Sequence, residues 1–246
     1  MRMKDRIAVV TGAASGFGAG IATRFAEEGA RVAIVDLNLA AAETLARELG
    51  GLALACDVSR GDEVEAMAAR IRAELGEADI LVNNAGVGHT PQPLESLAEA
   101  EFDRIWSVNV KSAYLTARAF VPAMKARRSG CILNVASTGG VSPRPNLTWY
   151  NASKGWLITA TRAMAIELAP FGVRVNAINP VAGETPLLKT FMGEDTPETR
   201  ARFLASIPLG RFSTPADMGA AAAFLCSDDA AMVTGVAMEV DGGRCI

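Results

Sequence analysis

The chain has 246 residues, of which 50% are hydrophobic, and its 24 basic and 27 acidic residues leave a net charge of −3. This length suits a single α/β domain with a sizeable buried core. The near balance of charge offers no basic face for a nucleic acid, and no apolar run reaches the roughly eighteen residues that a membrane span needs. We therefore expect neither a nucleic-acid nor a membrane partner.

The first residues lead directly into a short apolar stretch at 7–10, without the hydrophobic region and cleavage site of an export signal. We therefore expect a cytoplasmic protein. The four cysteines are scattered and His89 is the only histidine, so the pattern predicts neither disulfides nor a metal site. Tyrosine, lysine and carboxylate side chains must then carry most of the proton chemistry.

The first third of the chain alternates between strand-like and helix-like segments. Strands are predicted at 6–10, 31–35, 51–55 and 78–82, and helices at 19–28, 39–49 and 60–75. Such alternation predicts a parallel sheet covered by helices.

A glycine-rich turn joins the first strand to the first helix and reads Thr11-Gly12-Ala13-Ala14-Ser15-Gly16-Phe17-Gly18. Gly12 allows a tight turn, Gly16 allows the backbone to approach a pyrophosphate, and Gly18 allows close helix packing. The spacing differs from the commoner Gly-x-Gly-x-x-Gly, and an ordinary strand-to-helix turn could also use these residues.

The second strand ends at Asp36, eighteen residues after Gly18 (36 − 18), near the roughly twenty expected for an acid that binds an adenosine ribose. A carboxylate there repels a 2′-phosphate, and neither Leu37 nor Asn38 could neutralise one. This pattern favours NAD over NADP. The alternative is that Asp36 is only a turn residue at a strand end.

The remainder of the chain continues the alternation. Helices are predicted within 94–128 in two parts, at 149–169 and at 215–225, and strands at 131–136, 173–178 and 236–240. The insertion at 181–212 is predicted to be a substrate lid, about 183–212. The helix at 149–169 is apolar nearly all round, which favours an oligomer.

Tyr150 and Lys154 lie four residues apart and therefore share one helix face, where a cation could stabilise a phenolate. The pair alone is a weak signal, because an aromatic ring over a lysine stem is common on helix surfaces. Ser137 at a strand end, and Asn109 in a helix where asparagine is unfavourable unless its amide is used, strengthen it.

Together, Thr11-Gly12-x-x-x-Gly16-x-Gly18, Asn83-Asn84-Ala85-Gly86, Asn109, Ser137 and Tyr150-x-x-x-Lys154 closely resemble the short-chain dehydrogenase/reductase family over the whole chain. The resemblance implies a single NAD(P)-binding domain, 1–246, with a Rossmann-type three-layer α/β fold, a seven-stranded parallel sheet and a homotetrameric assembly. It also implies that Tyr150 is the general acid/base, that Lys154 holds the nicotinamide ribose and favours the phenolate, and that Ser137 binds the substrate oxygen. Asn109 would hold a water linking Lys154 to solvent.

The cofactor site that these features predict comprises Gly12, Ser15, Gly16, Phe17, Gly18, Asp36, Leu37, Asp57, Val58, Asn84, Ala85, Gly86, Tyr150, Lys154, Pro180 and Thr185. Within it, Asp57 and Val58 resemble the pair that contacts adenine, and Pro180 and Thr185 resemble the segment that holds the carboxamide. Val181 and Gly183 depart from the family pattern. On residue size, Val181 would narrow the cofactor side and Gly183 would leave room for substrate.

The predicted substrate pocket comprises Ser137, Arg144, Asn146, Trp149, Gly183, Glu184 and Leu188. Its mixed character fits a small hydroxylated or acid-bearing molecule. Arg144, between two prolines, could bind an anion, although an arginine in such a loop is more often simply solvated.

Two enzymatic functions remain open beside a non-catalytic nucleotide sensor, which normally loses the catalytic Tyr or Lys. The first is an NAD-dependent dehydrogenase that interconverts a secondary alcohol (polyol, sugar or hydroxy acid) and its ketone. The second is a 3-oxoacyl-thioester reductase. Asp36 and Phe171 favour the first, whereas Arg128 matches one basic position of the second. The sequence leaves open the alcohol, the direction, and the choice between dimer and tetramer.

Overall fold

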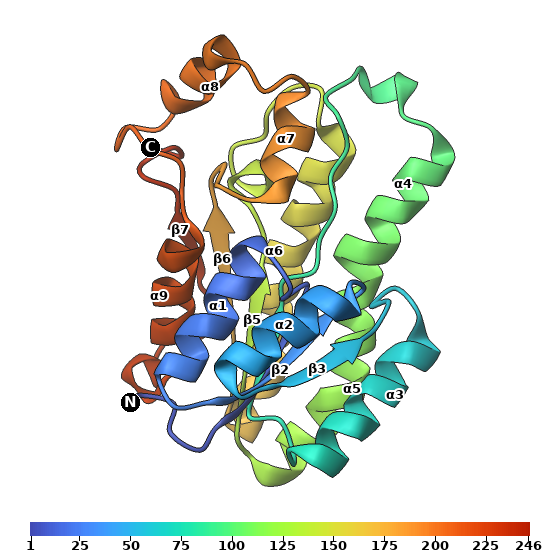
Figure 1. The fold of residues 1–246 in the computed structure, drawn as a ribbon, viewed down its shortest axis with the longest axis vertical. Helices are drawn as coiled ribbons and strands as arrows, with labels where there is room; N and C mark the ends of the chain where they lie inside the picture. The colour runs from blue at the N-terminus through green and yellow to red at the C-terminus, as the bar shows by residue number, and fades with distance from the viewer.

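A computed structural model describes all 246 residues, and its centre is one seven-stranded sheet in which every pairing is parallel (Figure 1). The strand order is β3-β2-β1-β4-β5-β6-β7. The strands are β1 (Ile7–Thr11), β2 (Arg31–Asp36), β3 (Leu52–Ala55), β4 (Ile80–Asn83), β5 (Gly130–Val135), β6 (Val173–Pro180) and β7 (Ala237–Val240). The predicted parallel sheet is therefore confirmed.

Helices cover both faces of the sheet and make the predicted three layers. One face packs on α1 (Gly16–Glu27), α2 (Leu39–Leu49) and α9 (Pro215–Cys226), and the other on α3 (Gly61–Glu74), α5 (Ser112–Arg127) and α6 (Thr148–Leu168). Each interface has its own buried cluster, of 22 and 21 residues. The strands are buried on both sides, as parallel strands between two helical layers must be.

The strand order reverses between β1 and β4. The chain builds outward through β2 and β3, and then crosses to the other side of β1 to continue through β4 and β5. Loops leave the carboxyl ends of β1 and β4 in opposite directions, which opens a crevice between them. The glycine-rich turn and the Asn83–Gly86 segment lie at this point.

The helical region predicted at 94–128 is more divided than expected. It contains a 3₁₀ turn (Leu94–Ser96), α4 (Glu99–Trp106), a π-helical turn (Ser107–Lys111) and α5. Asn109 lies in the π-helical turn and is 2% exposed. Most other boundaries differ from the prediction by one to three residues. The helix predicted at 19–28 begins at Gly16, because Ser15 is still extended and serves as its N-cap.

The segment predicted to be a lid folds as two short helices, α7 (Pro186–Met192) and α8 (Pro197–Leu204). Each begins with proline directly after a threonine, a typical helix start. A small apolar cluster of Val181, Leu188, Ile207 and Phe212 holds this segment to the end of β6. The C-terminal turn after β7 docks on it through a hydrogen bond from the Leu209 amide to the Gly242 carbonyl, 3.1 Å, and Figure 1 shows the C-terminus near α8.

None of the helices combines the length with the apolar character needed to cross a bilayer.

Candidate active site

A cavity of about 870 Å³ runs along the carboxyl edge of the sheet, between the glycine-rich turn and the lid. Most of the predicted cofactor and substrate residues line it: Gly12, Ser15, Gly16, Phe17, Asp36, Leu37, Asp57, Val58, Asn84, Ala85, Gly86, Ser137, Arg144, Tyr150, Lys154, Pro180, Gly183, Thr185 and Leu188. Gly18, Asn109, Asn146, Trp149 and Glu184 lie outside the lining.

The glycine-rich turn depends on the absence of side chains. Gly12 and Gly16 have φ values of +61° and +56°, in the left-handed region that favours glycine. A Cβ at Gly18 would overlap the Gly12 carbonyl oxygen, so Gly18 lies outside the lining because it packs the helix start against the turn. Ser15 caps α1 in an extended conformation, and its hydroxyl makes no capping hydrogen bond.

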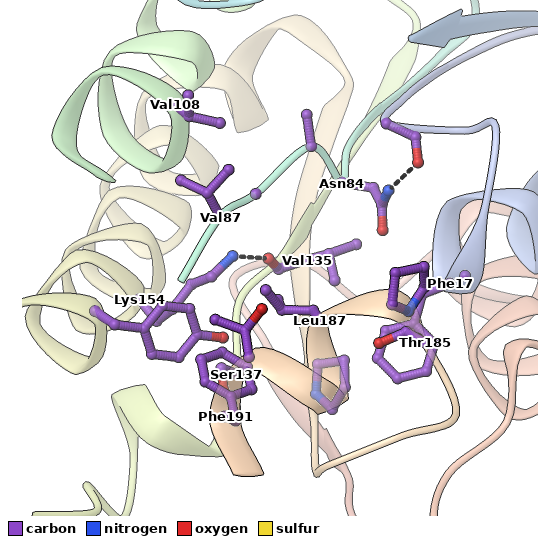
Figure 2. A pocket seen from close by; sticks show the side chains of 18 of the residues that line it. Phe17, Asn84, Val87, Val108, Val135, Ser137, Lys154, Thr185, Leu187 and Phe191 are labelled. Atoms are coloured by element: carbon purple, nitrogen blue, oxygen red, sulfur yellow. Dashed lines mark hydrogen bonds between the residues drawn. The ribbon is translucent and has the colours of Figure 1, made fainter. Parts of the chain in front are cut away.

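Side chains from the neighbouring strand ends hold the turn in place. Asn84 Nδ2 donates to the carbonyl oxygens of Thr11 and Gly12, both at 2.9 Å. Figure 2 labels Asn84 and draws a hydrogen bond from its side-chain nitrogen as a dashed line. Thr11 Oγ1 accepts from the amides of Asn84 and Ala85, both at 3.1 Å. These hydrogen bonds hold the carboxyl ends of β1 and β4 together beside the cavity.

Asp36 lies at the far end of the cavity from Tyr150 along the glycine-rich turn. Its carboxylate accepts the Ala14 amide at 3.0 Å and the Asn38 amide at 2.9 Å. The basic residues lining the cavity are Arg104, Arg144 and Lys154, none of which comes from the segments around Asp36. A side-chain-free turn at a helix N-terminus, with a carboxylate beyond it, fits a dinucleotide.

Ser137, Tyr150 and Lys154 meet at the other end, where β5 ends and α6 begins. The Ser137 side chain is near enough to Tyr150 to act on the pKa of the phenol, and its Oγ accepts the Gly139 amide at 3.0 Å. Lys154 Nζ donates to the Val135 carbonyl at 2.9 Å and lies 5.9 Å from the centre of the Tyr150 ring (Figure 2). The four-residue spacing on α6 places the phenol and the amine on one face, as predicted.

Burial sets the proton affinity of this pair in the protein alone. Burial raises the pKa of Tyr150 to about 12, against the effect of the Ser137 side chain, which acts to lower it. Burial also lowers the pKa of Lys154 to about 8. The sequence suggests that the lysine lowers the pKa of the phenol. In the protein without a bound cofactor, desolvation is the largest cause and the pKa is raised, so Tyr150 is a neutral proton donor at pH 7.

Asn109 acts through its side-chain amide, which the sequence indicated must be used. Its Oδ1 accepts the Val87 amide at 2.8 Å, and its Nδ2 donates to the Val87 carbonyl at 2.9 Å and to Ser153 Oγ at 3.0 Å. The π-helical turn therefore anchors the loop after Gly86 beside Lys154. A Cβ at Gly86 would lie 3.2 Å from Lys154 Nζ and 3.5 Å from Asn109 Oδ1.

The substrate end is apolar near Tyr150 and is partly formed by the lid. Phe191 of α7 packs against Tyr150, with ring centres 4.8 Å apart, and Leu147, Leu188 and Phe203 complete this wall. Arg104 of α4 also lines the cavity, which no sequence motif indicated. It forms an ion pair with Glu101 at 2.7 Å and donates to the Gly88 carbonyl at 2.9 Å.

Three predicted substrate residues point elsewhere. Trp149 donates to the Leu94 carbonyl at 3.0 Å and packs edge-on against Phe102, whereas Asn146 and Glu184 are exposed. Adjacent residues on a helix or turn face different directions, so proximity to Tyr150 in sequence did not place them in the cavity.

Gly183 has a different role from the one that residue size suggested. A Cβ there would overlap the Phe17 ring and come within 2.5 Å of Ser213 Oγ. The space left by the missing side chain is filled by Phe17, and so it is not room for substrate. Val181 is 4% exposed and belongs to the apolar cluster of the lid.

Comparison with known proteins gives matches over nearly the full length. A family model described as enoyl-(acyl carrier protein) reductase matches residues 12–244. A 4-formylbenzenesulfonate dehydrogenase of Comamonas testosteroni is 50% identical over 99% of both chains, and a D-threitol dehydrogenase of Mycolicibacterium smegmatis is 40% identical over 100% of this chain and 95% of its own.

Solved structures agree with this result. The crystal structure of a 3-ketoacyl-(acyl-carrier-protein) reductase from Brucella melitensis complexed with NADH superposes with a TM-score of 0.95 at 52% identity, over 99% of this chain and 100% of that one. The family-model match over residues 12–244 and the identity of about half over nearly the whole chain establish the family. The chain therefore belongs to the short-chain dehydrogenase/reductase family of oxidoreductases.

Proposed function

We propose that this protein is an NAD-dependent dehydrogenase that interconverts a secondary alcohol and its ketone. The observation that carries the proposal is the meeting of Ser137, Tyr150 and Lys154 at one end of a cavity whose other end is a glycine-rich turn and Asp36. The named relatives include dehydrogenases, and their substrates range from a sulfonated aromatic aldehyde to a polyol, so the names support the reaction class more than one substrate.

A nicotinamide dinucleotide bound along the glycine-rich turn would accept hydride from the alcohol carbon or, in its reduced form, donate hydride to the ketone carbon, and the protein would manage the proton. Ser137 Oγ orients the substrate oxygen beside the Tyr150 phenol. In ketone reduction, the neutral phenol donates its proton to the forming alkoxide; in alcohol oxidation, the same oxygen accepts the hydroxyl proton. Lys154 places a positive charge near this oxygen, which favours the phenolate and is expected to hold the nicotinamide ribose. Asn109 orients the loop beside Lys154, and the water that it is predicted to hold would connect Lys154 to solvent.

Tyr150→Phe tests the catalytic role, because it keeps the ring packed on Phe191 and removes only the acid/base oxygen. We expect kcat/KM to fall by roughly 10²- to 10⁴-fold across a panel of polyols, aldoses and hydroxy acids, with NAD affinity by calorimetry nearly unchanged. Tyr114→Phe is the matched control, because Tyr114 is the only other tyrosine and is 54% exposed. Wild-type turnover by Tyr150→Phe would refute the assignment.

The preference for NAD rests on Asp36, whose carboxylate lines the cavity with no lysine or arginine beside it. The relative crystallised with NADH is consistent with it. A 2′-phosphate would meet a negative charge, because none of the basic lining residues comes from the segments around Asp36.

A 3-oxoacyl-thioester reductase is the alternative, and the similarity to a 3-ketoacyl-(acyl-carrier-protein) reductase favours it. Arg128, the basic position that suggested it, donates to the Pro170 carbonyl at 2.8 Å, and the Phe171 ring is covered by Lys125 at 4.6 Å. Comparing NADH oxidation with acetoacetyl-CoA and NAD reduction with the alcohol panel separates the two. A kcat/KM higher for the thioester than for every alcohol would establish the alternative.

We also propose a homotetramer. Large apolar side chains are exposed on α5 and α6: Tyr114 is 54% exposed, Ile166 78% and Trp156 36%. Sedimentation equilibrium should give four chains for the wild type and smaller species for Ile166→Glu. Leu94→Glu, at an exposed leucine outside α5 and α6, is the control and should leave the assembly intact.

A further inference from the structure

Two arginines approach one another at the substrate end of the cavity, and neither has a carboxylate partner. Arg144 lines the cavity, and Arg244 of the C-terminal turn lies behind it, bonded to Ser142 in the same loop and outside the cavity lining. Neither forms an ion pair, whereas Arg104, the other arginine that lines the cavity, is paired with Glu101. A partly buried guanidinium without an anion is unfavourable unless a ligand supplies one.

Arg144 is held in a fixed position relative to Tyr150. Asn151, the residue after Tyr150 on α6, donates to the Arg144 carbonyl at 2.8 Å and is itself buried. The Arg144 guanidinium lies 4.4 Å from the centre of the Phe203 ring and donates weakly to Ser206 Oγ at 3.3 Å. Stacking on an aromatic face leaves most of its N–H groups available.

Arg244 approaches from a separate part of the chain. Its Nη1 donates to Ser142 Oγ at 3.2 Å, two residues before Arg144, and its buried Nε has no partner. The acid in the same turn, Asp241, is occupied by the amides of Gly243 at 2.9 Å and Cys245 at 2.8 Å. The C-terminal turn therefore brings a second positive charge to the Arg144 loop, and no carboxylate forms an ion pair with it.

The electrostatics agree with the geometry. Burial, and next the charge of Arg244, lowers the pKa of Arg144 below its ordinary value. A bound anion would relieve both effects, because it replaces lost solvation and separates two like charges.

We propose that Arg144, reinforced by Arg244, is an anion subsite that selects alcohols and carbonyl compounds carrying a carboxylate or sulfonate at the end remote from the reacting carbon. This inference rests on the proposed dehydrogenase function and specifies its substrate class. Arg144 binds the anion directly, and Arg244 is a positioning and charge-supplying residue.

The wall between the two ends defines the body of that substrate. Phe191 packs against Tyr150, Phe203 packs against the Arg144 guanidinium, and both line the cavity together with Leu147 and Leu188. These side chains provide no hydrogen-bonding groups, so a polyol chain would lose hydration there, whereas an aromatic ring would not. The subsite therefore fits a compact apolar body with a reacting oxygen at one end and an anion at the other.

The test compares reduction of 4-acetylbenzenesulfonate, 4-acetylbenzoate and acetophenone with NADH. These ketones share a body and differ only at the remote position. We expect wild-type kcat/KM to favour the two anions over acetophenone. Arg144→Met should lower kcat/KM for the anions by roughly 10- to 100-fold, the range of a charge-assisted hydrogen bond, and change acetophenone by less than about threefold. The ratio of sulfonate to benzoate distinguishes the two anions.

Variants of other arginines test whether the loss is specific to the Arg144 site or follows from any change to the lid segment or to the charge of the cavity. Arg244→Met should produce the same selective loss at a smaller size, and Arg144→Lys should partly retain anion preference. Arg202→Met removes an exposed arginine of α8 next to Phe203 and should not alter the ratio of anionic to neutral substrate. Arg104→Met removes a cavity arginine that already has Glu101, and any effect should be equal for all three ketones.

Calorimetry with benzenesulfonate in the presence of NADH measures the subsite without turnover. Binding should be detectable in the wild type and weakened in Arg144→Met, with an unchanged melting temperature indicating that the variant is folded. Equal losses for anionic and neutral ketones, or no wild-type preference for the anions, would overturn the subsite. Such a result would leave the dehydrogenase assignment in place if Tyr150→Phe still abolishes turnover, so the two proposals fail separately.

Discussion

The cofactor end of the cavity is built mainly from backbone, and the substrate end from side chains. At the cofactor end, Gly12, Gly16 and Gly18 keep side chains away, and the Asn84 amide holds the turn through main-chain oxygens. At the substrate end, Phe191, Phe203 and Arg144 come from the lid and from the loop after β5.

The difference reflects what each end must recognise. A pyrophosphate is met by main-chain N–H groups at a helix start, and these need only a fixed backbone path. A particular alcohol must be distinguished by shape and charge, which only side chains provide. The four predictions below test this division, in order of decreasing expected effect.

Lys154→Met should have the largest effect on activity, because it removes the positive charge that is proposed both to favour the Tyr150 phenolate and to hold the nicotinamide ribose. We expect kcat/KM to fall by roughly 10²- to 10³-fold, the size of a lost electrostatic contribution to a transition state. Stopped-flow measurement of hydride transfer checks this. Lys111→Met, at an exposed lysine of the π-helical turn, is the control. Unchanged hydride transfer would show that the charge of Lys154 is not used.

Asp36→Asn should change cofactor choice without changing the substrate end. The amide keeps the size of the carboxylate and removes its charge, so the ratio of kcat/KM for NADP to that for NAD should rise by roughly 10- to 100-fold. Asp57→Asn, the neighbouring cavity carboxylate after β3, is the control. A preference for NADP already present in the wild type would contradict the assignment.

Lys154→Met should also change how stability depends on pH. Folding lowers the pKa of Lys154 from 10.5 to about 8, so between these values the unfolded chain binds more protons and wild-type stability rises with pH. The variant lacks this contribution. Its free energy of unfolding relative to wild type should therefore fall by about 1–3 kcal/mol from pH 7 to pH 10.

Urea unfolding of the cofactor-free proteins at several pH values measures this difference. Loss of the hydrogen bond to the Val135 carbonyl lowers the free energy of unfolding of the variant by the same amount at every pH. It therefore does not change how the difference between variant and wild type depends on pH. A difference that stays constant with pH would show that Lys154 is not desolvated.

Gly183→Ala should have the smallest effect, a loss of stability. It tests the contact between Gly183 of the lid segment and Phe17 of the glycine-rich turn. The new methyl group would overlap the Phe17 ring, and overpacking of this kind costs about 1–2 kcal/mol. Thermal melting measures the loss, and Phe17→Leu in the same chain should restore part of it. Gly155→Ala is the control, because its Cβ would have no neighbour closer than 3.7 Å. Equal melting temperatures would indicate that the lid is not seated on Phe17.

The sequence predicted the cofactor end more completely than the substrate end. Gly12 and Asn84 each follow a strand and Asp36 ends one. Parallel strands bring their carboxyl ends to one edge of the sheet, so the convergence of these residues follows from local pattern. Trp149 and Asn146 are also close in sequence to Tyr150 but point away from the cavity. The direction of a side chain in a loop or a first helical turn depends on its neighbours, which the pattern does not contain.

The sequence by itself determined the order of strands and helices, the glycine-rich turn, and the shared face of Tyr150 and Lys154, because each depends on backbone geometry over a few residues. Only the tertiary structure decided that Asn109 anchors the Val87 loop, that Phe17 fills the space at Gly183, and that Arg244 comes beside the Arg144 loop. These contacts join segments far apart in the chain, and their formation depends on how the whole sheet and its lid pack.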